Sequence, residues 1–219
     1  GEGQGRTRAD ALGVPFYPVS HQQGHIAAAA WSAGRLELLD RPMLAWHLSG
    51  GTTELLYVEP DGVNVRAQCV GGTSDISAGQ LIDRTGVLLG LPFPAGKALD
   101  ALASESGPVR GFPVKLNDLT FSLSGMENKV KALAEQGEPP AEIARFTLET
   151  VASAVRRATA AARKRWPGLP VLCSGGVASN RLLRTVMSDA AFAAPQYSTD
   201  NAMGAAILAW RSLRQEAEA

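Results

Sequence analysis

Two histidines stand four residues apart in the segment HQQGHIAAAA. On a helix, His21 and His25 would share one face, with their Cβ atoms about 6 Å apart, and two imidazoles at that spacing can bind one divalent cation. A zinc protease of the His-Glu-x-x-His type needs a glutamate directly after the first histidine, where this chain has Gln22. The pair alone leaves two interpretations open, a metal site and two polar residues on one helix turn.

Two Ser-Gly-Gly sequences each follow an apolar segment that is typical of a β-strand. They are LSGGTTE, residues 48–54, and SGGVASN, residues 174–180. Glycines at the end of a strand leave backbone N–H groups accessible to a phosphate. The second loop also leads into a predicted helix, whose N-terminus favours anions. One such loop is commonly only a tight turn, but two of them favour a nucleotide held between two lobes.

Two aspartates could complete such sites. Asp83 lies inside an amphipathic helix pattern, where an exposed helix face or an ion pair is the alternative interpretation. Asp200 precedes an alanine-rich helix and can act as its N-cap, as can Ser198, Thr199 and Asn201. A carboxylate at a cap can still serve as the third ligand of a metal ion.

The composition is that of an ordinary globular protein. The 219 residues are 45% hydrophobic, 19% charged and have a formal net charge of zero. We therefore expect no membrane or DNA partner, and any basic surface for RNA must be local or belong to another subunit. Cys69 and Cys173 are expected to be buried, reduced thiols. Because there is no long apolar run and no signal-peptide core, a cytoplasmic location is expected.

The order of patterns predicts an α/β protein. Residues 42–72 read as an antiparallel strand meander, 77–91 as a helix, and 118–137 as a short strand followed by a helix. A long amphipathic helix follows the EPP sequence. Residues 169–190 read as strand, glycine turn and helix, and 195–213 as a repeat of that order. Alternation of strands and helices after residue 110 predicts some parallel pairing, and the meander predicts a mixed sheet.

Six motifs, in this order, resemble those of one family, the catalytic subunit of tRNA threonylcarbamoyladenosine synthase, formerly classed as an O-sialoglycoprotein endopeptidase of the M22 type. HQQGH resembles its His-x-x-Gly-His motif, and LSGGTTEL its Ser-Gly-Gly-His-Thr loop. SAGQLIDRTGVLLGLPFPAG is similar to its Ala-Gly-Glu-Ala-Phe-Asp-Lys helix and the Leu-Gly-Leu-x-Tyr-Pro-Gly-Gly after it. FSLSGMENKV resembles Phe-Ser-Phe-Ser-Gly-Leu-Lys-Thr, SGGVASNRLLR resembles Gly-Gly-Val-x-Ala-Asn-x-x-Leu-Arg, and STDNAMGAAILAW resembles the closing Thr-Asp-Asn motif. The resemblance runs from about Gly13 to the last helix.

The resemblance implies a two-lobed α/β fold of the actin and sugar-kinase type, with a nucleotide in the cleft. It implies that one metal ion, iron or zinc, is held by His21, His25 and Asp200. It implies that threonylcarbamoyl-AMP, or an ATP-like nucleotide, is contacted by Ser49, Gly50, Gly51, Asp83, Gly96 and Asn180. The implied reaction transfers the threonylcarbamoyl group to an adenosine amine beside the tRNA anticodon, with the metal as Lewis acid. The implied partners are tRNA and a family partner subunit or a second copy.

The start of the chain departs from the family pattern. A family member begins with a strand that carries a Gly-x-Glu-Thr-Ser phosphate loop, which GEGQGR does not supply. We therefore expect the first lobe to be incomplete at the N-terminus. Residues 1–40 are interpreted as its remnant with the metal-binding helix, and 41–219 as an α/β nucleotide-binding region with inserted helices.

Five residues also differ from the family motifs. Thr52 replaces a histidine, Gln80 a glutamate, Ile76 a second aspartate, and Met126 and Glu127 a Leu-Lys pair. The last exchange adds negative charge near an expected RNA or phosphate path. The missing first phosphate loop and the altered Met126-Glu127 pair favour a non-catalytic paralogue that acts as a scaffold or partner subunit, whereas the unbroken metal triad favours a transferase. A metalloprotease, the third alternative, is disfavoured by the missing glutamate.

Overall fold

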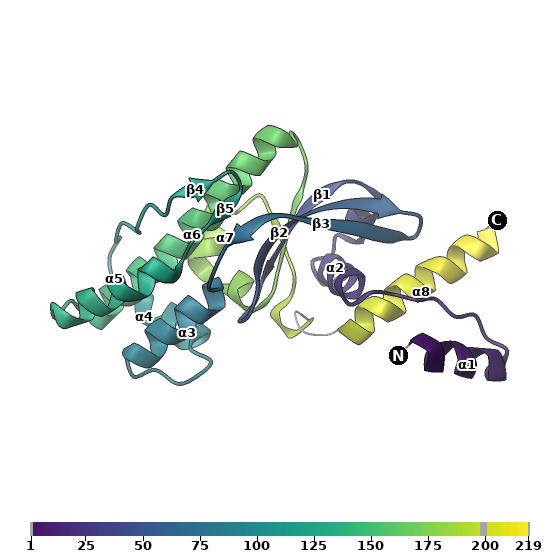
Figure 1. Cartoon of the computed structure of the whole chain (residues 1–219), viewed down its shortest axis with the longest axis horizontal. Helices are drawn as coiled ribbons and strands as arrows, with labels where there is room; N and C mark the ends of the chain where they lie inside the picture. Colours follow the sequence, from purple (N-terminus) through teal and green to yellow (C-terminus); the bar gives the residue numbers. More distant parts are fainter. Residues whose placement is uncertain (1, 198–200, 219) are drawn as a thin grey trace.

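A mixed seven-stranded sheet forms the centre of the computed structural model, which describes residues 2–197 and 201–218 (Figure 1). The strands are β1 (Met43–Leu48), β2 (Thr53–Asp61), β3 (Asn64–Thr73), β4 (Leu116–Asn117), β5 (Thr120–Phe121), β6 (Val171–Ser174) and β7 (Ala191–Phe192), in the sheet order β4-β5-β3-β2-β1-β6-β7. β1, β2 and β3 form an antiparallel meander, while β6 pairs with β1, and β7 with β6, in parallel. The predictions of a meander, of a mixed sheet and of parallel pairing in the second half are confirmed.

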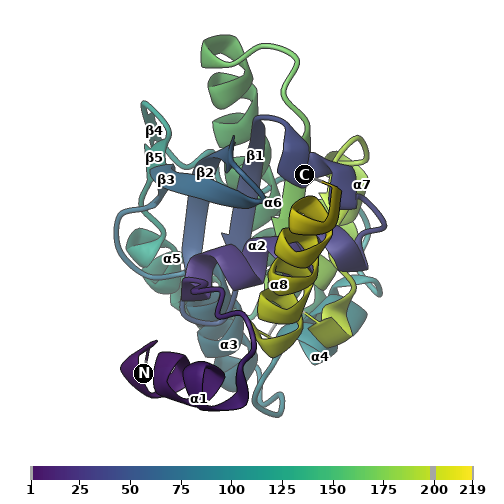
Figure 2. The same ribbon diagram turned by 90° about the vertical axis from the view of Figure 1, so that its right-hand side faces the viewer.

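Helices cover both faces of this sheet. The helices of the described residues are α1 (Glu2–Leu12), which lies apart from the sheet, α2 (His21–Ser32), α3 (Ala78–Leu88), α4 (Gly96–Ala103), α5 (Ser124–Glu135), α6 (Pro140–Arg165), α7 (Arg181–Val186) and α8 (Asn201–Glu218), with 3₁₀ turns η1 (Leu36–Asp40), η2 (Gly176–Ser179) and η3 (Pro195–Tyr197). α2 and α8 lie side by side against one face, and α6 runs along the other (Figures 1 and 2). No described helix is both long and apolar enough to cross a membrane.

The interior strand β1, which lies between β2 and β6, is buried on both faces. Leu44, Trp46 and Leu48 belong to the hydrophobic core shared with α3, α6 and α7. Met43 and Ala45 belong to a second core, which includes residues of α2 and α8. This alternation follows from the two-residue period of a β-strand. β1 therefore separates two packed layers, and a polar residue on it must face one or the other.

Two expectations from the sequence are wrong. Residues 195–197 form the turn η3 instead of a strand, and the strand that pairs with β6 is β7, a few residues earlier. Pro195 has no N–H to donate to a strand ladder, which disfavours pairing at that point. Cys69 is exposed, because β3 has its outer neighbour β5 only at Gly72 and Thr73, whereas Cys173 is buried as expected. The division of the chain at residue 40 stays a prediction.

Candidate functional site

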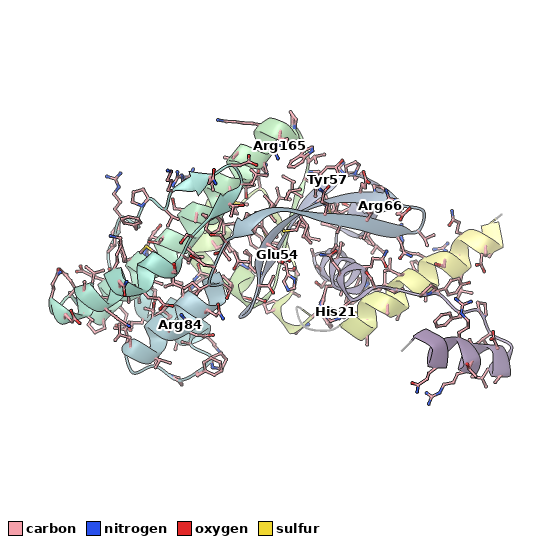
Figure 3. The ribbon with its side chains drawn as sticks, in the orientation of Figure 1. His21, Glu54, Tyr57, Arg66, Arg84 and Arg165 are labelled. Atoms are coloured by element: carbon pink, nitrogen blue, oxygen red, sulfur yellow. The ribbon has the colours of Figure 1, made fainter. Side chains whose placement is uncertain are left out.

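The first two histidines lie on the N-terminal turn of α2 and converge. Ser20 caps this helix: its Oγ accepts from the N–H of Gln23 at 3.1 Å, and the Gln23 side chain accepts from the N–H of Ser20 at 2.8 Å. This capping box begins the helix at His21 and gives the imidazoles their shared face. The Nε2 atoms of His21 and His25 are 2.8 Å apart. Figure 3 shows His21 beside the first turns of α8. The predicted convergence of this pair is present.

The glycine of the HQQGH motif brings α8 to the same place. A Cβ atom built on Gly204 would lie 1.8 Å from the carbonyl oxygen of Gly24, so the two helices cross in backbone contact. Gly204 is in the first turn of α8, which begins at Asn201. The start of α8 is therefore held against the histidine-bearing turn of α2. The third predicted ligand, Asp200, lies outside the described residues.

His47, which we did not select from the sequence, joins the pair. It comes from β1, and its ring centroid is 5.6 Å from that of His25. All three histidines of the chain thus line one pocket of about 270 Å³, together with Glu54, Ser174 and other residues. The signal was present in the sequence: if Leu44, Trp46 and Leu48 face one layer, His47 must face the other, which is the layer of α2.

Two histidines in this pocket, His25 and His47, favour the neutral form. Burial lowers the pKa of His25, and the nearby His21 and His47 lower it further. Burial also lowers the pKa of His47, and His21 adds to the effect. A neutral imidazole is the form that binds a metal ion.

A divalent cation fits part of this site. The two converging Nε2 atoms offer two ligand positions of the kind that iron and zinc accept. Within residues 2–197 and 201–218, no three His, Cys, Asp or Glu side chains are grouped closely enough to hold an ion. The fit to a metal therefore rests on His21 and His25.

A second, larger pocket lies beside the loop that follows β1. Its volume is about 600 Å³, and four of the six predicted substrate residues line it: Gly50, Asp83, Gly96 and Asn180. Ser49 and Gly51 belong to the same loop as Gly50 but do not line the pocket. Its other lining residues include Lys97 and Asp100 of α4 and Leu148 of α6, which the sequence did not single out.

The two Ser-Gly-Gly loops meet beside this pocket. They follow β1 and β6, which are parallel neighbours, so the loops emerge at the same edge of the sheet. Gly175 has φ of 95°, and a Cβ atom there would lie 2.2 Å from the carbonyl oxygen of Leu48. A Cβ atom on Gly79 would lie 2.5 Å from the Cα of Gly50. Glycine is thus required where the loops touch each other and where α3 touches the first loop.

Ser49 and Asp83, two of the predicted substrate residues, also accept hydrogen bonds from backbone N–H groups. The Oγ of Ser49 accepts from the N–H of Thr52 at 3.0 Å and closes the turn of the first loop. The carboxylate of Asp83 accepts from the N–H of Ala95 at 2.8 Å, which fixes the start of α4 next to Gly96. Each side chain therefore shapes the pocket through the loop that it holds.

Asn180 has three roles in one place. Its Oδ1 caps α7 by accepting from the N–H of Leu183 at 2.9 Å, and its Nδ2 donates to Asp100 at 2.7 Å. Asp100 also accepts from the Nε of Arg181 at 2.8 Å. This network ties α4 to α7 across the pocket, on whose wall Asn180 lies.

Three of the residues that differ from the family motifs have a structural explanation. Gln80 completes the capping box of α3, accepting from the N–H of Ser77 at 2.9 Å. Met126 is buried in the core, and Glu127 forms an ion pair with Arg84. The charge that Glu127 adds is therefore balanced within the chain.

Comparison with solved structures shows which proteins share this fold. Full-length HypF, in a phosphate- and nucleotide-bound form, matches with a TM-score of 0.70 at 15% identity, over 94% of this chain and 44% of that one. The (R)-2-hydroxyglutaryl-CoA dehydratase component A of Acidaminococcus fermentans matches with a TM-score of 0.59 at 16% identity, over 94% of this chain and 74% of that one. The expected α/β fold class of actin- and sugar-kinase-like proteins is confirmed.

Sequence comparison gives the family. A sequence model of tRNA N6-adenosine threonylcarbamoyltransferase (TsaD) matches residues 1–207. The protein of that name from Thermus thermophilus is 38% identical over 210 residues, which are 93% of this chain and 62% of that protein. Its namesake in Enterococcus faecalis is 37% identical over 186 residues, 81% of this chain and 51% of that protein. The chain belongs to this family and spans less than two thirds of the length of these relatives.

Proposed function

We propose that this chain carries the metal- and nucleotide-binding part of a tRNA threonylcarbamoyltransferase. The observation that carries the proposal is the meeting of Gly50, Asp83, Gly96 and Asn180 around one pocket of about 600 Å³. These residues come from four separate segments, and a glycine-rich loop at a strand end is a site that phosphate groups use. The substrate proposed for this pocket is threonylcarbamoyl-AMP.

The proposed metal site holds one divalent ion, iron or zinc, through His21, His25 and Asp200. When bound, the ion would act as a Lewis acid toward a phosphate or carbonyl oxygen of the substrate. The adenosine amine forms a bond to the carbamoyl carbon, the mixed-anhydride bond to phosphate breaks, and AMP leaves with the bonding electron pair. The amine loses one proton. No covalent enzyme intermediate is required.

The proposed partners are tRNA and either a family partner subunit or a second copy of this chain, in the cytoplasm. A second candidate function is a non-catalytic scaffold that binds metal and nucleotide without transfer. The observation that favours it is Thr52, which lines the histidine pocket where the family motif has an imidazole.

Elemental analysis of the purified full chain tests the proposal. We expect close to one iron or zinc ion per chain, lost in His21→Ala and in Asp200→Ala. Cys69→Ser serves as the control, because it removes an exposed metal-binding side chain elsewhere and should leave the metal content unchanged. Transfer of the labelled group from threonylcarbamoyl-AMP to unmodified tRNA then separates the transferase from the scaffold. A chain that binds neither metal nor nucleotide would refute both functions.

A further inference from the structure

A polar groove of about 340 Å³ lies between residues 109–113 and the middle of α6. Three arginines line it, Arg110, Arg156 and Arg157. Among the described lining residues, Glu149 is the one acid, and its carboxylate already accepts from the guanidinium of Arg145 at 2.8 and 3.0 Å. The chain as a whole has no net charge, so this groove is a local excess of positive charge.

The groove is held open by a loop that is fixed to the helix. The N–H of Phe112 donates to the Oγ1 of Thr150 at 2.8 Å. A Cβ atom on Gly111 would lie 2.6 Å from the backbone nitrogen of Thr150, so the loop backbone rests directly on α6. On the other side of the loop, Arg157 donates to the carbonyl oxygen of Val114 at 2.6 Å. The backbone positions of the three arginines are therefore set by the fold before any ligand binds.

Two of the guanidinium groups are available to a ligand. Arg110 and Arg156 are exposed, and no ion pair in the described part of the chain includes either of them. Guanidinium groups bind phosphate oxygens through paired N–H donors, which suits adjacent phosphates of a nucleic-acid backbone. Among the described residues, no aromatic side chain lines the groove, so the groove does not offer stacking on bases.

The groove adjoins the nucleotide pocket. Consecutive residues of α6 face the two cavities, Leu148 the pocket and Glu149 the groove. The segment around α7 also connects them, with Asn180 on the pocket and Val186 on the groove. A strand bound in the groove would therefore lie on the face of α6 next to the one that lines the pocket.

We propose that this groove binds the sugar-phosphate backbone of the RNA substrate, in a sequence-independent manner. The inference rests on the proposed function, which requires an RNA next to the nucleotide pocket. A chain with no net charge needs a local basic surface to bind RNA by itself, and this groove is such a surface. Contacts of this kind position an RNA and carry no sequence information.

Fluorescence anisotropy with labelled, unmodified tRNA at several salt concentrations tests this. We expect Arg110→Gln and Arg156→Gln each to weaken binding about five- to tenfold, and each to reduce the slope of log K against log salt by about 1. Arg66→Gln is the matched control: it removes the same charge from the β2–β3 hairpin, away from the groove (Figure 3), and should leave affinity and slope nearly unchanged. Thermal unfolding checks that all three variants are folded.

Three outcomes would overturn the inference. Unchanged affinity and slope in both groove variants would show that RNA binds elsewhere. Equal loss in the Arg66→Gln control would show a diffuse charge effect. Stronger competition by a polyglutamate peptide than by polyuridylate would indicate an acidic protein partner. The metal and nucleotide measurements on the same variants stay normal in each case, so failure of the groove is distinguishable from failure of the proposed function.

Discussion

Gly24 and Gly204 meet in backbone contact at the crossing of α2 and α8, where a Cβ atom on Gly204 would lie 1.8 Å from the carbonyl oxygen of Gly24. The glycine between the two histidines of the first motif is therefore explained by helix packing. It lets the start of α8 approach the turn that carries His21 and His25. The two glycines thus allow the N-terminal end of α8 to pack beside the histidine motif, which lies about 180 residues earlier in the chain.

Gly204→Ala should separate α8 from α2. The added methyl group meets backbone atoms that cannot rotate away, and we expect a loss of about 1–3 kcal/mol in the free energy of unfolding. Metal affinity should fall with it. Gly125→Ala in α5 is the control, because a Cβ atom there meets nothing within 4 Å and alanine favours a helix. Urea unfolding measures the stability of both variants. Equal stability would contradict the close backbone contact of α2 and α8.

The buried hydrogen bond between Trp46 and Thr159 should couple β1 to α6. The indole Nε1 donates to the Thr159 Oγ1 at 2.8 Å, and both residues are buried. Thr159→Val leaves the indole N–H without a partner and should cost about 1–3 kcal/mol. In a Trp46→Phe background the same change should cost about 1 kcal/mol less, because no donor is left unpaired. Additive effects in the double-mutant cycle would show that the bond contributes nothing.

The metal-free protein should lose stability on mild acidification. The pKa values of His25 and His47 are lowered from 6.5 in the folded state, so the unfolded chain binds protons first as the pH falls. Above pH 6.5 both states are neutral at these residues, and the contribution to stability is fully present. It is lost progressively as the pH falls below about 6.5, the ordinary pKa of a histidine in the unfolded chain. The urea midpoint as a function of pH measures this, and His47→Gln should flatten the curve. A midpoint that stays constant or rises over this window would contradict the expectation.

Two substitutions of Asn180 separate its role as the N-cap of α7 from its role in the wall of the larger pocket. Asn180→Ser keeps an N-cap oxygen for α7 but lacks the amide that bonds Asp100, whereas Asn180→Ala loses both. Both variants should bind ATP about tenfold more weakly by calorimetric titration. The alanine variant alone should lose about a further 1 kcal/mol of stability. Full nucleotide affinity in Asn180→Ser would show that the amide does not position the ligand.

The fold was predictable where hydrophobic residues recur with the clear period of a strand or a helix. The strand alternation of residues 43–73 and the long pattern of α6 predicted elements that the structure contains. The convergence of His21 with His25 followed from their spacing on one helix. Pairing across the sheet was not predictable, because only the register of β1 against β2 and β6 brings His47 opposite Glu54 and Ser174.

The arginine groove was hidden for a related reason. Arg110 and Arg156 are far apart in the sequence, and a count of charges over the whole chain cancels them against acids elsewhere. What brings them together is the seating of Gly111 on the backbone of α6. The motifs predicted four of the residues that line the larger pocket, whereas the surroundings of that pocket depend on such loop contacts.

The walls of the larger pocket come from chain segments around residues 50, 83, 96, 180 and 195. A bound nucleotide would therefore join the ends of several long stretches of chain, as a cross-link does, and would restrict the openings through which proteases reach the backbone. A rising ligand concentration would then lower the rate at which proteases cleave the chain.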